Sequence, residues 1–198
     1  TIYLNNFRGF QNTFLDIKGV NFFVGENSTG KTSVLKIIKL LLNRDFLNSN
    51  DLAIQNNDLG FFSDIVNESS NNGSFFELGV LNKNKEGVLN AAKFVYVKKN
   101  GFPALQEMFI WDDNRIINTL LESGKWKYKV KEMKENSSPS KIRDAFEFFM
   151  SKKFLNEEEY LGIDDTEFSK REPYFPLFPN LLMSIGEKLE SNNLLLFS

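Results

Sequence analysis

The sequence contains no cysteine and no histidine. Without cysteine the chain has no disulfide, no thiol nucleophile and no thiolate ligand for a metal. Without histidine it has no imidazole base and no zinc site of the usual ligand types. If the complete assembly cuts nucleic acid by histidine-dependent chemistry, we expect the nuclease to lie outside this sequence.

Long apolar runs and a strong charge imbalance are also missing. No apolar segment reaches the length of a membrane span, and the start lacks a basic region followed by an apolar one. We therefore expect a soluble, cytoplasmic protein without a membrane partner. The net charge is −2, so the chain as a whole gives no sign of nucleic-acid binding. Its 41% hydrophobic residues, which include 21 phenylalanines, are ample for a folded core.

The strongest motif is the segment 25–32, which fits the phosphate-binding pattern G-x-x-x-x-G-K-[ST] at every fixed position. The residues before it, 20–24, are predicted to form a buried strand, and 33–42 are predicted to form a helix. Strand, glycine loop and helix in this order let backbone N–H groups converge on a polyphosphate at the positive end of the helix. The predicted nucleotide ligands in this segment are Gly25, Glu26, Asn27, Ser28, Thr29, Gly30, Lys31, Thr32 and Ser33.

Two residues of the motif have side-chain roles. Lys31 is expected to reach the β- and γ-phosphates of ATP as a point charge. The Thr32 hydroxyl is expected to complete the coordination of a Mg²⁺ that bridges them. The expected cofactors are therefore ATP and Mg²⁺. A glycine turn that merely precedes a helix is the alternative reading of the same residues.

The region before the loop is predicted to form two short strands, at 1–5 and 13–17, joined by the turn 6–10. A simple nucleoside kinase or small GTPase has its phosphate loop after the first strand. With this opening, the chain resembles the amino-terminal lobe of the ABC-type ATPase heads of the structural-maintenance-of-chromosomes, RecF and OLD group. The resemblance implies that Asn27 is the usual loop asparagine and that Arg8 lies close to the bound nucleotide. A solvated turn residue is the alternative for Arg8.

The segment 58–66 carries a second resemblance, to the D-L-G-x-[FY]-x-D-[IL]-V segment of bacterial AAA-type ATPases related to OLD proteins. These include ATPases of Septu-like and retron-associated antiphage systems. That resemblance implies a separate nuclease or effector subunit and a role in antiphage defence. From the residues alone, Phe61, Phe62, Ile65 and Val66 form an apolar helical face.

Downstream, the segments 74–81, 91–98, 109–111 and 125–130 have strand character and predict an antiparallel sheet. We therefore expect an α/β fold in which a P-loop lobe adjoins this sheet over residues 1–135. Residues 136–198 are expected to form a helical insertion or connector leading into a further strand. Four lysines alternate over 125–131, so they lie on one face of a strand, which either contacts nucleic acid or is solvated.

Two ATPase motifs are not found: an apolar strand ending in Asp-Glu, and a Ser-Gly-Gly signature loop. We therefore expect a piece of a longer chain, with no catalytic residue of its own. In such heads a glutamine usually reaches the metal, and Gln55 and Gln106 are the two candidates for this role. The favoured function is an ATPase head that forms a homodimer or larger homo-oligomer around Mg-ATP and switches a partner or a nucleic-acid complex. A non-hydrolysing nucleotide-sensing or scaffold module, and a small-molecule phosphotransferase, are the alternatives.

Overall fold

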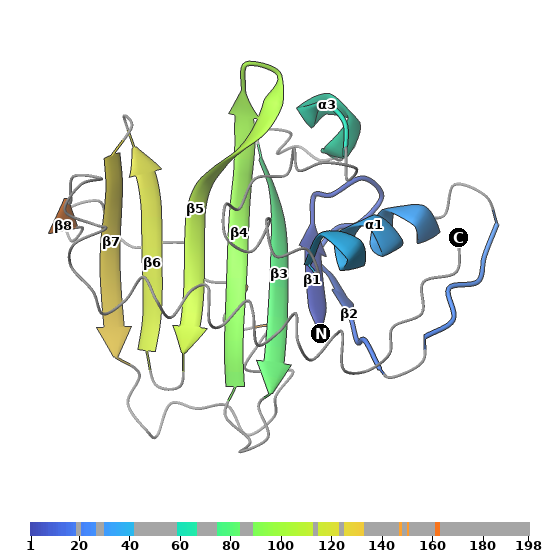
Figure 1. Ribbon diagram of the computed structural model, residues 1–198, viewed down its shortest axis with the longest axis horizontal. Coiled ribbons are helices and arrows are strands. Elements are labelled where there is room, and N and C mark those ends of the chain that lie inside the picture. The colour runs from blue at the N-terminus through green and yellow to red at the C-terminus, as the bar shows by residue number, and fades with distance from the viewer. Residues whose placement is uncertain are drawn as a thin grey trace.

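The computed structural model contains one sheet of eight strands, with two described helices beside it (Figure 1). It describes residues 1–18, 21–26, 30–41, 59–66, 75–83, 89–112, 115–122, 125–132, 147, 150 and 161–162. The order of strands in the sheet is β2-β1-β3-β4-β5-β6-β7-β8, and every neighbouring pair is antiparallel. The strands are β1 (Ile2–Asn5), β2 (Thr13–Leu15), β3 (Phe75–Lys83), β4 (Leu89–Lys99), β5 (Phe102–Asp112), β6 (Arg115–Glu122), β7 (Lys125–Glu132) and β8 (Leu161–Gly162). The helices are α1 (Lys31–Leu41) and α3 (Phe62–Ile65).

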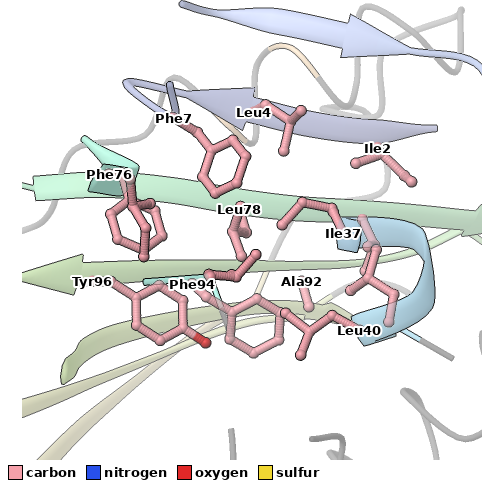
Figure 2. Close-up of a cluster of buried hydrophobic side chains, with 14 of the residues drawn as sticks. Ile2, Leu4, Phe7, Ile37, Leu40, Phe76, Leu78, Ala92, Phe94 and Tyr96 are labelled. Atoms are coloured by element: carbon pink, nitrogen blue, oxygen red, sulfur yellow. The ribbon is translucent and has the colours of Figure 1, made fainter. Parts of the chain in front are cut away.

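One face of the sheet carries the larger apolar cluster. Alternate residues of β1, β3, β4 and β5 point to this face, because successive strand residues point to opposite sides. α1 lies against it and contributes Ile37 and Leu40 to the same cluster as Leu78 and Phe94 (Figure 2). We call this the helix-covered face. Its buried strand residues are Ile2, Leu4, Phe76, Leu78, Val80, Ala92, Phe94, Tyr96, Met108, Ile110 and Ile117.

The opposite face buries charge. The Lys93 side chain is 2% exposed, and its ammonium lies 3.5 Å from Glu77 Oε1. The same ammonium donates a 3.0 Å hydrogen bond to the Met150 carbonyl and lies 4.3 Å from the centroid of the Phe109 ring. A charge this deeply buried is stable only because these groups replace its water. We call this the polar face.

Further polar groups surround that ion pair. Glu77 also accepts hydrogen bonds from Asn5 at 2.8 Å and from Tyr3 at 3.3 Å. Burial and the neighbouring carboxylate together raise the pKa of Tyr3, so its hydroxyl stays protonated and can donate. Burial also raises the pKa of Glu107, although a 3.0 Å hydrogen bond from Asn118 opposes the shift.

Gly79 on β3 lies directly beneath the Met150 side chain. A Cβ at this position would lie 2.8 Å from both Cε and Sδ of Met150 and 3.1 Å from Cβ of Tyr3. A larger residue at position 79 would therefore force the flexible end of Met150 to move. Met150 belongs to the region that the sequence predicts to be helical, and it is helical and buried here.

Most predicted elements are confirmed. The two opening strands, the hairpin of β3 and β4, and β7 form where the sequence predicts them, and β5 extends well beyond the predicted 109–111. β6 has no predicted counterpart. The register places Lys129 of β7 opposite Asn118 and Lys127 opposite Leu120. Almost all of 136–198 lies outside the described residues, so the division into 1–135 and 136–198 stays a prediction.

The predicted buried strand at 20–24 is wrong for the part that the structure describes. Residues 21–24 are not in a strand, and the Phe22 and Val24 side chains are 85% and 88% exposed. Phe23 between them does pack against the cluster on the helix-covered face. A strand requires backbone hydrogen bonds to a neighbouring strand, and no described residue supplies them to this segment. Within the described parts of the chain, neither helix has the length and hydropathy of a bilayer span.

Candidate functional site

The site begins at the amino-terminal end of α1. The first hydrogen bond of the helix runs from the Val34 N–H to the Gly30 carbonyl, at 3.0 Å. The N–H groups of the first turn therefore have no acceptor inside the helix, and the helix dipole makes this end positive. No acidic residue lies in that turn, so the chain does not neutralise the positive end with a carboxylate of the same turn. This end of the helix is suited to an anion.

The loop before α1 is shaped by two glycines and one lysine. Gly25 and Gly30 have φ angles of 151° and 89°, which residues with a Cβ rarely adopt. The Lys31 ammonium donates a 2.8 Å hydrogen bond to the Gly25 carbonyl and a second hydrogen bond to the Glu26 carbonyl. The lysine thus reaches back from the first residue of α1 to the start of the loop. This contact places a positive charge between the two ends of the predicted motif.

Arg8 links the helix end to a distant segment. It lies in the turn after β1, where its own φ is 49°. Nη1 donates a 2.8 Å hydrogen bond to Ser33 Oγ, and Nη2 donates a 3.2 Å hydrogen bond to the Leu59 carbonyl. Its Nε is buried and has no hydrogen-bond partner among the described residues. Arg8 therefore holds the buried Ser33 hydroxyl, while its Nε–H has no acceptor among the described residues.

The segment 59–66 closes the other side of this turn. The Arg8 N–H donates to the Ile65 carbonyl, and Phe7 forms a bridge with Val66. Of the predicted apolar helical face, Phe62 and Ile65 lie in α3 and are buried, whereas Phe61 and Val66 are extended residues outside the helix and Phe61 is exposed. Asp64 accepts a 2.9 Å hydrogen bond from the Phe61 N–H at the start of the short helix. The second segment that the resemblance singles out thus contacts Arg8 directly.

The structure brings most of the predicted site residues together. Gly25, Glu26, Gly30, Lys31, Thr32, Ser33 and Arg8 belong to one connected region, in which the Thr32 side chain is exposed. Asn27, Ser28, Thr29 and Gln55 lie outside the described residues. Gln106 is an exposed residue of β5. Two contacts of this region were not anticipated: the Leu59 carbonyl on Arg8, and the Phe10 ring beside Gly30. Neither has a sequence signal, because both join segments far apart in the chain.

Comparison with known families agrees with this geometry. The model of the family described as AAA ATPase domain matches residues 1–180. The chain belongs to the AAA ATPase domain family. Searches of curated proteins and of solved structures gave no match. Membership of the AAA ATPase domain family supports an ATP-binding ATPase function and implies the use of ATP and, as a rule, of Mg²⁺. The mostly antiparallel sheet with few described helices is compatible with an α/β nucleoside triphosphatase.

The residues of this AAA ATPase domain fit those cofactors. The positive helix end, the two glycines with positive φ and the Lys31 ammonium form a cationic cradle suited to phosphate oxygens. The exposed Thr32 hydroxyl is the kind of oxygen donor that Mg²⁺ accepts. Bound Mg²⁺ would neutralise charge that develops on the phosphates. Holding the phosphates would fall to the loop N–H groups and to Lys31.

Proposed function

We propose that this chain is the nucleotide-binding part of an ATPase head of the SMC, RecF and OLD type. In this proposal the head binds Mg-ATP through Gly25–Thr32, hydrolyses it, and forms a dimer or larger homo-oligomer around it. The proposal rests on the position of the Lys31 ammonium, which lies across the loop at the amino terminus of a helix whose first turn carries no acidic residue. An anion with several oxygens is the ligand that satisfies this arrangement best.

The assignment to the SMC, RecF and OLD type is supported by what precedes and follows the loop. β1, the Arg8 turn and β2 come before it, and Arg8 connects the first turn of α1 to the segment at Leu59. We propose that Arg8 senses the occupied loop through Ser33 and passes the change to the segment 59–66. Such a connection would let nucleotide binding bias a second surface of the head.

The partner in this proposal is a separate nuclease or effector subunit, in an antiphage setting. The absence of histidine from these 198 residues is consistent with a division of labour, because a histidine-dependent nuclease would have to lie outside them. Nucleic acid is a second candidate partner. The alternating lysines of β7 support it, since strand periodicity places them on one face.

The first test is the affinity of the protein for ATP after Lys31→Ala. Because a charge-assisted hydrogen bond contributes about 1.5–3 kcal/mol, we expect the dissociation constant to rise roughly tenfold to a hundredfold. Isothermal titration with ATP and Mg²⁺ measures it. Lys39→Ala is the matched control, because Lys39 is an exposed lysine in the last turn of the same helix. Equal affinities of both variants and the unmutated protein would exclude the phosphate role of Lys31.

The alternative function is a nucleotide-binding module that does not hydrolyse ATP. It is favoured by one sequence observation: no apolar strand followed by Asp-Glu occurs in the chain. ATP turnover and sedimentation with and without Mg-ATP separate the two functions. Binding with turnover and nucleotide-dependent dimerisation supports the ATPase head. Binding without turnover supports the module, and binding without any change in sedimentation contradicts dimerisation around the nucleotide.

A further inference from the structure

The turn that carries Arg8 is held in place independently of the phosphate loop. Phe7 and Phe10 close it with two backbone hydrogen bonds, from the Phe7 N–H to the Phe10 carbonyl at 3.1 Å and from the Phe10 N–H to the Phe7 carbonyl at 2.8 Å. The bridge between Phe7 and Val66 fastens the turn to the segment at α3. Phe7 itself is fully buried beside Phe76 (Figure 2). The turn is therefore a support held by backbone contacts outside the phosphate loop, and it lies near the start of α1 (Figure 1).

The Phe10 ring extends from this support onto Gly30. A Cβ built on Gly30 would lie 2.7 Å from Phe10 Cζ and 2.9 Å from Cε2. The ring therefore occupies the space that a side chain at position 30 would need, and it contacts the glycine backbone. Gly30 has a φ of 89°, and its carbonyl accepts the first hydrogen bond of α1. The ring thus touches the residue at which the loop becomes the helix.

We infer that Phe10 is a positioning residue for the phosphates of the bound nucleotide. The inference rests on the proposed function, because it assumes that the loop binds those phosphates. The ring restricts the backbone of Gly30, and thereby the direction of the N–H groups that follow in the first turn. A loop that is ordered before the ligand arrives binds more tightly, since less conformational entropy is lost on binding. Without the ring, the ligand itself has to order this backbone.

The test compares ATP affinity in Phe10→Ala and Phe14→Ala. Phe14 is the matched control: it is also half-buried, but it lies on β2 and packs 4.9 Å from the Tyr3 ring, in a cluster that excludes α1. Ordering one residue corresponds to a change of about fivefold to thirtyfold in affinity. We expect Phe10→Ala to raise the dissociation constant by that factor and Phe14→Ala to leave it within about twofold. Thermal unfolding of both variants measures how far each is destabilised.

Two more variants separate positioning from general destabilisation. Phe10→Met refills the space with an apolar side chain, so its affinity for ATP should be close to that of the unmutated protein. This variant can also be measured if Phe10→Ala does not fold. Gly30→Ala should cost less affinity in the Phe10→Ala background than in the unmutated protein, because the contact at 2.7 Å is then gone while the strain from the positive φ remains.

Three results would overturn the inference. They are equal affinities of Phe10→Ala and Phe14→Ala, no restoration by Phe10→Met, and additive effects of the Phe10 and Gly30 substitutions. The Lys31→Ala variant distinguishes this failure from failure of the proposed function. If Lys31→Ala loses affinity while Phe10→Ala keeps it, only the positioning role is wrong. If Lys31→Ala also keeps its affinity, the phosphate site itself is wrong.

Discussion

The two faces of the sheet bury their side chains by different means. The helix-covered face is apolar, and Ile37 and Leu40 of α1 pack onto it without any buried ion pair among the described residues. The polar face buries Lys93 and Glu77 under Met150, with Tyr3, Asn118 and Glu107 around them. The helix-covered face is stabilised by removing apolar surface from water, whereas the polar face combines matched polar partners with a smaller apolar cluster that includes Phe109, Trp111 and Met150.

This difference indicates which face of the sheet tolerates amino-acid substitutions better. Apolar packing has no required direction, so the helix-covered face holds α1, and with it the phosphate loop, by volume and shape. The polar face depends on particular partners, because any group left alone there loses its water without replacement. The candidate site is thus built on the face whose packing is less dependent on individual polar contacts.

The largest expected effect comes from a cavity on the helix-covered face. Phe94 is fully buried, so Phe94→Ala should lower the free energy of unfolding by about 3–5 kcal/mol. Urea unfolding followed by circular dichroism measures it. Phe22→Ala is the control, because this side chain is 85% exposed, and its effect should stay within about 0.5 kcal/mol. Comparable losses at both positions would mean that Phe94 does not belong to the core.

A smaller loss is expected when the ion pair of the polar face is broken. Glu77→Leu leaves the Lys93 ammonium buried without its carboxylate, and we expect a cost of about 3 kcal/mol, at the low end for such pairs because Glu77 is 13% exposed. The double variant Glu77→Leu with Lys93→Met replaces both charges with apolar groups and should lose less than Glu77→Leu alone. The same unfolding assay measures Glu77→Leu, Lys93→Met and the double variant. If the double variant lowers the free energy of unfolding by the sum of the two single-variant effects, the two side chains do not interact.

The smallest effect concerns pH. Because the pKa of Glu107 is raised above its ordinary value of 4.5, the folded protein holds this proton more tightly than the unfolded chain. Its contribution to stability is therefore complete below about pH 4.5 and is lost as the pH rises through the raised pKa. Glu107→Gln keeps an acceptor for Asn118, and its side chain cannot ionise, so it does not lose stability as the pH rises. The variant should therefore be more stable than the unmutated protein at pH 7 and equally stable at pH 4.

Urea midpoints at the two pH values measure this difference. Glu147→Gln serves as the control at an exposed position. If the urea midpoints of Glu107→Gln and the unmutated protein differ by the same amount at both pH values, the pKa of Glu107 is not raised. It would also weaken the contrast between the two faces, since a carboxyl group of the polar face would then behave as an ordinary exposed acid.

The prediction of the fold succeeded where local signals were strong. The hairpin of β3 and β4 and the helix α1 follow from alternation and from helical periodicity, both of which are visible over a few residues. β6 has no predicted counterpart because its apolar and polar residues come in adjacent pairs and do not alternate. Residues 21–24 were assigned to a buried strand because their composition is apolar, yet burial depends on a neighbouring strand and not on composition.

The amino-acid sequence by itself determined the chemistry of the candidate site. The glycines at 25 and 30, Lys31 and Thr32 identify a phosphate loop, because their conformational freedom, charge and hydroxyl group are properties of the residues themselves. Only the tertiary structure decided that Arg8 joins Ser33 to Leu59, that Phe10 lies on Gly30, and that Lys93 is buried under Met150. These contacts join segments that are distant in the chain. Which segments meet depends on the pairing of the strands and on the packing of α1, and no local pattern in the sequence records either.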